Sequence, residues 1–207
     1  MTLYTLKPRF QALLRPSARA LHDRGVTANK VTLGACAGSV ALGTGVALAA
    51  DAGQLRWFLL LPVWFLLRMA FNAIDGMLAR EFGQRSTLGA YLNELSDPLS
   101  DAALYLPFAL LTGVPATPTL CVIFLSNLSE MAGLLGYLAA GSRRNDGPMG
   151  KSDRALVFGV LGLLLGVGML PGLWLSWVLA IVALLLLATI ANRVRQGIAE
   201  DGSSTRR

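Results

Sequence analysis

The stretch FNAIDGMLAREFGQRSTLGAYLNELSDPLSD, residues Phe71–Asp101, places acidic side chains in segments that are otherwise apolar enough for a membrane. The acids in these segments are Asp75, Glu94, Asp97 and Asp101. Charged groups inside a membrane-spanning helix are costly, and they usually face a cavity or a partner of opposite charge. If the flanking segments enter a membrane, these acids are candidates for a functional site.

The composition of the whole chain indicates a membrane protein. Its 207 residues are 54% hydrophobic and 14% charged, and the mean hydropathy is +0.57. Six long apolar segments account for these values, and about 20 such residues suffice to cross a bilayer. The predicted spans are Val31–Ala50, Trp57–Ala79, Leu88–Leu111, Leu120–Ala140, Ala155–Leu170 and Leu173–Asn192. The sequence therefore predicts an all-α integral membrane protein with six transmembrane helices.

The basic residues predict its orientation. All but two of the 18 lysines and arginines fall at the termini or on alternate connections, and the exceptions are Arg56 and Arg68. The positive-inside rule then places both termini on the cytoplasmic side of what we expect to be a bacterial cytoplasmic membrane. This distribution explains the net charge of +6 without a nucleic-acid partner. Cys36 and Cys121 lie in different spans and form no disulfide framework, and His22 is predicted to be a surface residue.

Three segments divide the chain. Residues 1–30 form a basic cytoplasmic segment, and Leu3–Leu21 within it mixes aliphatic with basic side chains. We expect an amphipathic helix there, lying against lipid headgroups; the alternative is a plain basic tail. Residues 31–196 form the six-helix transmembrane domain, which would carry any catalytic site. Residues 197–207 are predicted to be a disordered cytoplasmic tail.

Helical spacing gathers the polar residues of two spans near one cytoplasmic turn. The second predicted span carries on one face Arg68, Asn72, Asp75, Gly76 and Ala79. The third carries, at intervals of four, Asn93, Asp97 and Asp101, with Glu94 beside them. Two such faces meeting in a hairpin would bring oxygen ligands together, as hard cations such as Mg²⁺ or Mn²⁺ require. The alternative is that the acids only neutralise Arg68 and Arg80.

These residues resemble the signature of the CDP-alcohol phosphotransferase family. That signature is Asp, two residues, Asp-Gly, two residues, Ala-Arg, seven or eight residues, Gly, three residues, Asp, three residues and Asp. The residues that match it in order are Asp75, Gly76, Ala79, Arg80, Gly89 and Asp97. Asn72 and Asn93 stand where the family has its first and third Asp. Six spans with cytoplasmic termini also agree, so the resemblance covers nearly the whole chain.

The resemblance implies a phospholipid-synthesis transferase. Such an enzyme moves a phosphatidyl group from a CDP-alcohol, usually CDP-diacylglycerol, to an acceptor alcohol and releases CMP. It implies Mg²⁺ or Mn²⁺ as cofactor, membrane lipids as surroundings and a homodimer. The sequence does not name the acceptor: glycerol phosphate, serine, inositol phosphate and the hydroxyl of another lipid all stay open.

The resemblance also implies roles for individual residues. By family position Asp97 is the catalytic base, with Asp101 as the alternative, and Arg80 orients a carboxylate or contacts phosphate. The implied metal ligands are Asn72, Asp75, Asn93, Asp97 and Asp101. The implied nucleotide-binding residues are Asn29, Thr32, Asn72, Asp75, Gly76, Ala79 and Arg80.

A basic loop before the fifth span is the second informative region. It contains DGPMGKSDR, residues 146–154, and the residues predicted to bind a phosphate of the acceptor or donor are Arg143, Arg144, Lys151 and Arg154. The alternative is a loop that is basic only because it is cytoplasmic. Glu130, inside the fourth span, either pairs with Arg68 or lines the path of the acceptor.

Two other hypotheses about the function are alternatives to an enzyme. A small cation transporter would also bury acids, but it needs polar residues along a complete path, and here they gather near one side. The second hypothesis is a family member that has lost catalysis and binds lipid or nucleotide. Asn72 and Asn93, which stand at two Asp positions of the signature, favour it.

Overall fold

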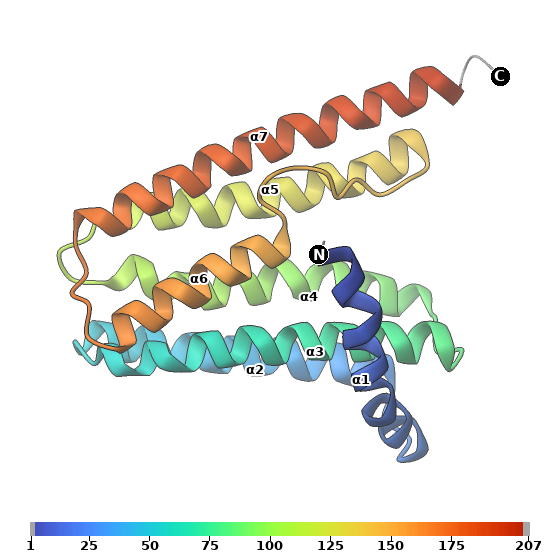
Figure 1. Ribbon diagram of the computed structural model, residues 1–207, viewed down its shortest axis with the longest axis horizontal. Coiled ribbons are helices and arrows are strands. Elements are labelled where there is room, and N and C mark those ends of the chain that lie inside the picture. The colour runs from blue at the N-terminus through green and yellow to red at the C-terminus, as the bar shows by residue number, and fades with distance from the viewer. Residues whose placement is uncertain (1–2, 205–207) are drawn as a thin grey trace.

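The computed structural model describes residues 3–204, and within them all regular structure is helical (Figure 1). The long helices are α1 (Leu3–Asp23), α2 (Ala28–Asp51), α3 (Leu60–Glu81), α4 (Thr87–Tyr105), α5 (Ala116–Ala140), α6 (Lys151–Gly166) and α7 (Leu173–Ser204). Two short 3₁₀ helices are η1 (Leu55–Leu59) and η2 (Leu106–Leu110). The predicted all-α class is confirmed.

Helices α2 to α7 run roughly along one axis, and α1 crosses one end of the bundle (Figure 1). Helix α5 packs along α7, α2 packs along α4 and α3, and α6 packs on α3. Small residues allow the closest approach: a Cβ atom at Gly43 of α2 would collide with the carbonyl oxygen of Ala103 in α4. This pairing of α2 with α4 positions both helices beside the C-terminal part of α3.

Each of the six predicted spans overlaps one long helix, but only part of the prediction is confirmed. Four segments of the described chain are long and apolar enough to cross a membrane: Ala28–Asp51, Leu55–Glu81, Ala116–Ala139 and Leu173–Glu200. Helix α4 carries three acids, and α6 has only 16 residues, fewer than the roughly 20 that a span needs. The chain is a multi-pass membrane protein, and six spans remain a prediction.

The N-terminal segment is a helix whose apolar side packs on α3. Ala18 is fully buried there, with Leu14 and Leu21 partly buried around it. The Arg15 guanidinium pairs with Glu81, the last residue of α3, at 2.9 Å. Helix α1 is thus docked on the bundle, and its contact with lipid headgroups stays a prediction.

The C-terminal segment differs from the predicted disordered tail. Helix α7 continues to Ser204, so residues 197–204 extend it, and residues 205–207 lie outside the described part. A contact across the bundle accompanies the extension, since the Ser142 hydroxyl donates to Glu200 at 2.8 Å. The sequence alone does not show this contact, because Ser142 lies in the connection between α5 and α6, far from Glu200 along the chain.

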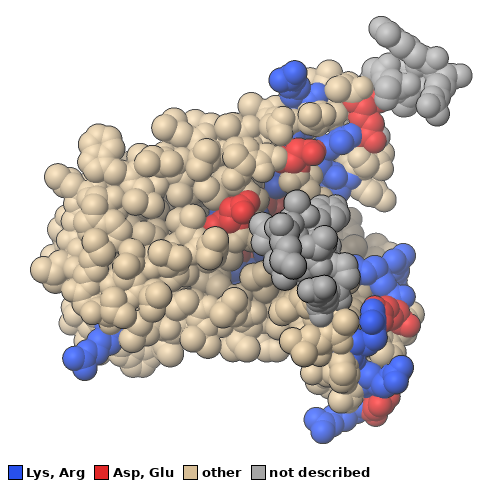
Figure 2. Space-filling model, viewed as in Figure 1, with Lys and Arg blue, Asp and Glu red and all other residues tan. Residues whose placement is uncertain are grey.

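Charged side chains gather at the end of the bundle that holds α1 and the C-terminal end of α7, and few lie at the opposite end (Figure 2). The core beyond this charged end is aromatic: the Tyr105 ring stacks on Phe158 with centroids 3.8 Å apart, and Phe108 meets Phe58 and Phe158 edge to face. The separation of charge is the predicted one. That the charged end faces the cytoplasm remains a prediction.

Candidate functional site

A cavity of about 470 Å³ opens among α2, α3, the turn after α3 and α4. Its lining residues are Ala28, Asn29, Thr32, Asn72, Asp75, Gly76, Ala79, Arg80, Gln84, Arg85, Ser86, Gly89, Ala90, Asn93 and Asp97. All the residues predicted to bind nucleotide are among them, as are all the predicted metal ligands except Asp101. The structure therefore brings the signature into one site, which we call the signature cavity.

Two helix caps fix the ends of α2 and α4 at this cavity. The Thr27 hydroxyl accepts the amide hydrogen of Lys30 at 3.3 Å, and the Ser86 hydroxyl accepts that of Gly89 at 3.0 Å. The N-terminal turns of α2 and α4 both contribute to the lining. Helix N-termini carry partial positive charge, so this arrangement favours an anionic ligand such as a diphosphate.

The signature glycines make room for polar side chains. A Cβ atom at Gly76 would lie 2.6 Å from Nη2 of Arg80, so the guanidinium folds back over this glycine. A Cβ atom at Gly89 would lie 2.8 Å from Oδ1 of Asn29. The Arg80 guanidinium thus occupies the space beside Gly76 and faces the cavity.

The oxygen donors of the cavity fit a divalent cation. The Thr32 hydroxyl donates to Oδ2 of the buried Asp75 at 2.8 Å and holds that carboxylate at the lining. Asp97, Asn72 and Asn93 complete the set, giving two carboxylates and two amides. No three His, Cys, Asp or Glu side chains of the described residues converge as a metal site. The donors are hard oxygens, but their charge suits one ion better than two.

Asp97 and Asp101 occupy different environments although they are one turn apart on α4. Asp97 lines the cavity, contacts Lys151 and lies 3.4 Å from the Arg68 guanidinium. Asp101 is 5% exposed and outside the lining, and it accepts from Arg68 at 2.5 Å and from Arg154 at 3.2 Å. Asp97 therefore has the access that a base needs, whereas Asp101 is a buried counter-ion.

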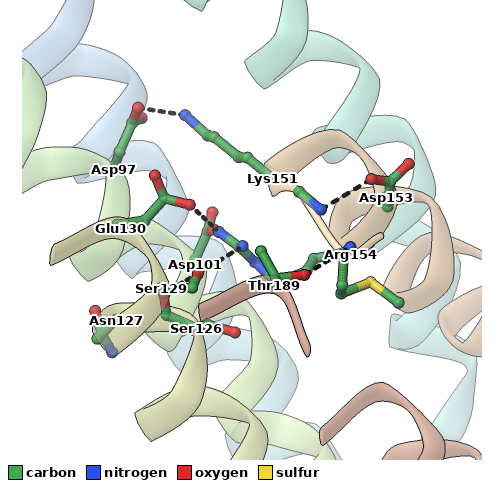
Figure 3. A network of polar contacts seen from close by, with 12 residues as sticks. Asp97, Asp101, Ser126, Asn127, Ser129, Glu130, Lys151, Asp153, Arg154 and Thr189 are labelled. Carbon is green, nitrogen blue, oxygen red and sulfur yellow. Dashed lines mark hydrogen bonds and ion pairs between the residues drawn. The ribbon is translucent and has the colours of Figure 1, made fainter. Parts of the chain in front are cut away.

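A cationic cluster adjoins the signature cavity through Asp97 (Figure 3). We define it as Arg68, Arg143, Lys151, Arg154 and Arg193. Its carboxylate partners are Glu94, Asp97, Asp101 and Glu130. The cluster joins α3, α4, α5, α6, α7 and the loop before α6, so only the complete bundle forms it.

Glu130 stands at the centre of this cluster. Its carboxylate lies 3.2 Å from the Arg143 guanidinium, 3.1 Å from that of Arg154 and 3.6 Å from that of Arg193. The prediction left its pairing with Arg68 open, and the structure gives Glu130 these three arginines instead. Arg144, predicted to act with its neighbours, pairs with Glu200.

The sequence did not predict a role in the site for two residues, Arg193 and Gln84. Arg193 was counted only as a topological charge, and its burial depends on the packing of α5 on α7. Gln84 accepts the amide hydrogen of Ala28 at 2.7 Å, and its side-chain nitrogen lies 3.1 Å from the ring of His22. Gln84 thus connects α1 and α2 at the cavity, and a lone amide in a polar turn gives no signal of this role. His22 is exposed, as predicted.

Comparison with known proteins agrees with this geometry. Residues 25–189 match the family model described as CDP-alcohol phosphatidyltransferase. The chain is 48% identical to the inner membrane protein YnbA of Escherichia coli, over 94% of this chain and 96% of the relative. It is 31% identical to a phosphatidylinositol phosphate synthase of Mycolicibacterium smegmatis, over 88% of this chain and 82% of the relative.

Solved structures share the fold. A phosphatidylinositol phosphate synthase of Mycobacterium tuberculosis in complex with manganese and citrate superposes with a TM-score of 0.73 at 22% identity, covering 89% of this chain and 88% of that one. The same protein with CDP-DAG bound gives a TM-score of 0.72 at 22% identity, covering 90% and 94%. The sequence signature, the cavity that collects it and the family model that spans residues 25–189 lead to one conclusion: the chain belongs to the CDP-alcohol phosphatidyltransferase family.

Proposed function

We propose that this chain is an enzyme that transfers the phosphatidyl group of CDP-diacylglycerol, or of a related CDP-alcohol, to an acceptor alcohol and releases CMP. The observation that carries the proposal is that one cavity collects the signature residues of α3 and α4 together with residues of α2. Its volume of about 470 Å³ is in the usual range for small-molecule sites. The relatives named as phosphatidylinositol phosphate synthases support the same reaction class.

The nucleotide of the donor binds in the signature cavity. The residues that hold it are Asn29, Thr32, Asn72, Asp75, Gly76, Ala79 and Arg80. The Arg80 guanidinium is the cation best placed to contact the diphosphate, because it folds toward the cavity over Gly76. The capped N-terminal turns of α2 and α4 add donors for the same anionic group.

Asp97 serves as the general base. It takes the proton of the acceptor hydroxyl, whose oxygen attacks the phosphorus of the phosphatidyl group while the bond from that phosphorus to the CMP oxygen breaks. CMP leaves with the electron pair of that bond. The contacts of Asp97 with Lys151 and Arg68 orient its carboxylate between the cavity and the cationic cluster.

A divalent cation, Mg²⁺ or Mn²⁺, would be held by Asp75 and Asp97 with the amide oxygens of Asn72 and Asn93. When bound, such an ion neutralises the diphosphate and stabilises the leaving CMP. Asp101, predicted as a further ligand, holds Arg68 and Arg154 instead.

The acceptor enters from the side of the cationic cluster, in which Lys151 contacts Asp97, and Arg143 and Arg154 both contact Glu130. Arg144, the next residue in the same loop as Arg143, pairs with Glu200 of α7 and so helps to hold that loop. The same proposal places the charged end and both termini in the cytoplasm, with the protein as a homodimer among membrane lipids.

The test is release of CMP by the purified protein from CDP-diacylglycerol, with Mg²⁺ or Mn²⁺ and a panel of alcohols. Asp97→Asn is the inactive variant, and Asp51→Asn, at the far end of α2, is the matched control. CMP release by the parent and the control alone is the expected result. Binding of CDP-diacylglycerol without CMP release for any alcohol would favour the member without catalysis that Asn72 and Asn93 suggest.

A further inference from the structure

The cationic cluster and its carboxylate partners, which would receive the acceptor, are together close to electrically neutral. Each cation of the cationic cluster contacts a carboxylate: Arg68 contacts Asp97 and Asp101, Arg143 contacts Glu94 and Glu130, Lys151 contacts Asp97, Arg154 contacts Asp101 and Glu130, and Arg193 contacts Glu130. Five cations therefore face four carboxylates. A site built to attract a dianion would keep a larger excess of cations than the single one found here.

The two deepest arginines already have polar partners for most of their nitrogens. Arg154 is 1% exposed: one terminal nitrogen contacts both Asp101 and Glu130, and the other lies 3.4 Å from the Ser129 hydroxyl. Arg193 is 3% exposed and donates to the backbone carbonyls of Asp146 and Ser129. Binding of a phosphate requires free, converging N–H donors. The Nε of Arg154 has no hydrogen-bond partner, but it is buried, and use of the other donors named here would cost each arginine a present partner.

The accessible cations are occupied as well. Arg143 contacts Glu94 with one terminal nitrogen and Glu130 with the other, which uses both arms of its fork. Lys151 contacts Asp97. A phosphate monoester here would displace a carboxylate and stay beside it in a poorly screened site. A hydroxyl can donate to Glu94 or Glu130 without displacing either ion pair.

We propose that the acceptor is an alcohol without a phosphate group, and that Glu130, together with Glu94, selects it by occupying the guanidinium groups that an acceptor phosphate would need. This inference rests on the proposed function, and it makes Glu130 a specificity-determining residue of that reaction. Asp97 lies where the cluster meets the signature cavity, so a hydroxyl bound at Glu94 or Glu130 enters beside the base.

The test uses pairs of alcohols that differ only by one phosphate and that both keep a free hydroxyl: glycerol with glycerol 3-phosphate, and inositol with inositol phosphate. The parent is expected to release CMP with the unphosphorylated member of a pair at least about tenfold faster, which corresponds to about 1.4 kcal/mol. Glu130→Gln should reduce this preference by about tenfold, because it frees donors of Arg143 and Arg154. Asp51→Asn, an exposed acid outside the cluster, should leave the preference unchanged.

A second measurement is independent of turnover. Calorimetry with glycerol 3-phosphate, in the presence of CMP, should show no saturable binding to the parent below about 1 mM and saturable binding to Glu130→Gln. Preference of the parent for the phosphorylated member, or saturable binding of glycerol 3-phosphate that Arg143→Gln abolishes, would overturn the proposal. Absence of CMP release with every alcohol would instead refute the proposed function, and the parent's calorimetry would still decide the inference.

Discussion

Replacing Asp101 with Asn should destabilise the protein, whereas the same change at Asp97 should stop the reaction. Asp101 is buried and is the partner of two arginines, with contacts of 2.5 Å to Arg68 and 3.2 Å to Arg154. The amide keeps the shape of the side chain but removes the charge that both guanidinium groups face. The two buried cations then lose a neutralising partner.

The magnitude follows from the partners that remain. Removal of one member of a buried ion pair costs about 3–5 kcal/mol. Arg68 keeps Asp97 at 3.4 Å and Arg154 keeps Glu130 at 3.1 Å, so we expect the low end, about 3 kcal/mol. For a chain of this size that loss lowers Tm by about 6–12 °C. Asp97 has a side chain that is 27% exposed, so Asp97→Asn should shift Tm by no more than about 3 °C.

The assay combines thermal unfolding in detergent with CMP release from CDP-diacylglycerol for both variants. Loss of the base at position 97 should lower the rate by about 10²–10⁴-fold, while Asp101→Asn at a temperature below its Tm should keep most of the activity. The opposite pair of results would refute the reasoning: a parent-like Tm with no activity for Asp101→Asn, and an active Asp97→Asn, would make Asp101 the base.

Three further predictions concern metal binding and orientation. Thr32→Val removes the hydroxyl that holds Asp75 and should weaken Mn²⁺ binding about 10–100-fold by calorimetry, and unchanged binding would remove Asp75 from the ligand set. The double substitution Asn72→Asp and Asn93→Asp should strengthen Mn²⁺ binding without nucleotide by about tenfold or more, because it adds two negative charges to the site. Two tightly bound ions in the parent would contradict the argument that its site has charge for only one. A cysteine replacing the exposed Ser152, in a background without native cysteines, should resist an impermeant reagent added outside the cell; modification there would invert the topology.

Much of the fold was predictable because lipid imposes a simple pattern on sequence. Apolar segments of about 20 residues indicate helices, so each predicted span overlaps a helix of the structure. The signature was equally predictable, because it fixes residue types at fixed spacing on two consecutive helices joined by a short turn. The helical state of residues 197–204 was not predictable, because this end of α7 is accompanied by a contact of Glu200 with Ser142, which lies in the connection between α5 and α6.

The charges around Glu130 could not be assigned from sequence for a physical reason. Helical spacing shows which residues share a face of one helix, but it does not show which distant helix that face meets. Glu130 pairs with arginines of the loop before α6, of α6 and of α7, each from a different part of the chain. The same limit applied to Asp101, which the spacing placed beside Asp97 and the packing turned toward Arg68 and Arg154.

The polarity of α4 and the shortness of α6 have a consequence for how the chain enters its membrane during synthesis. Neither helix is apolar and long enough to partition into lipid alone, whereas their neighbours α3, α5 and α7 are. The pair Arg68–Asp101 joins α3 to α4, so insertion of these helices as one hairpin lets the charges neutralise each other before either meets hydrocarbon. Arg154 of α6 finds its counter-ions on α4 and α5, both made earlier on the ribosome. If α4 and α6 span the membrane as predicted, each would insert only together with, or after, the helices that carry its counter-ions.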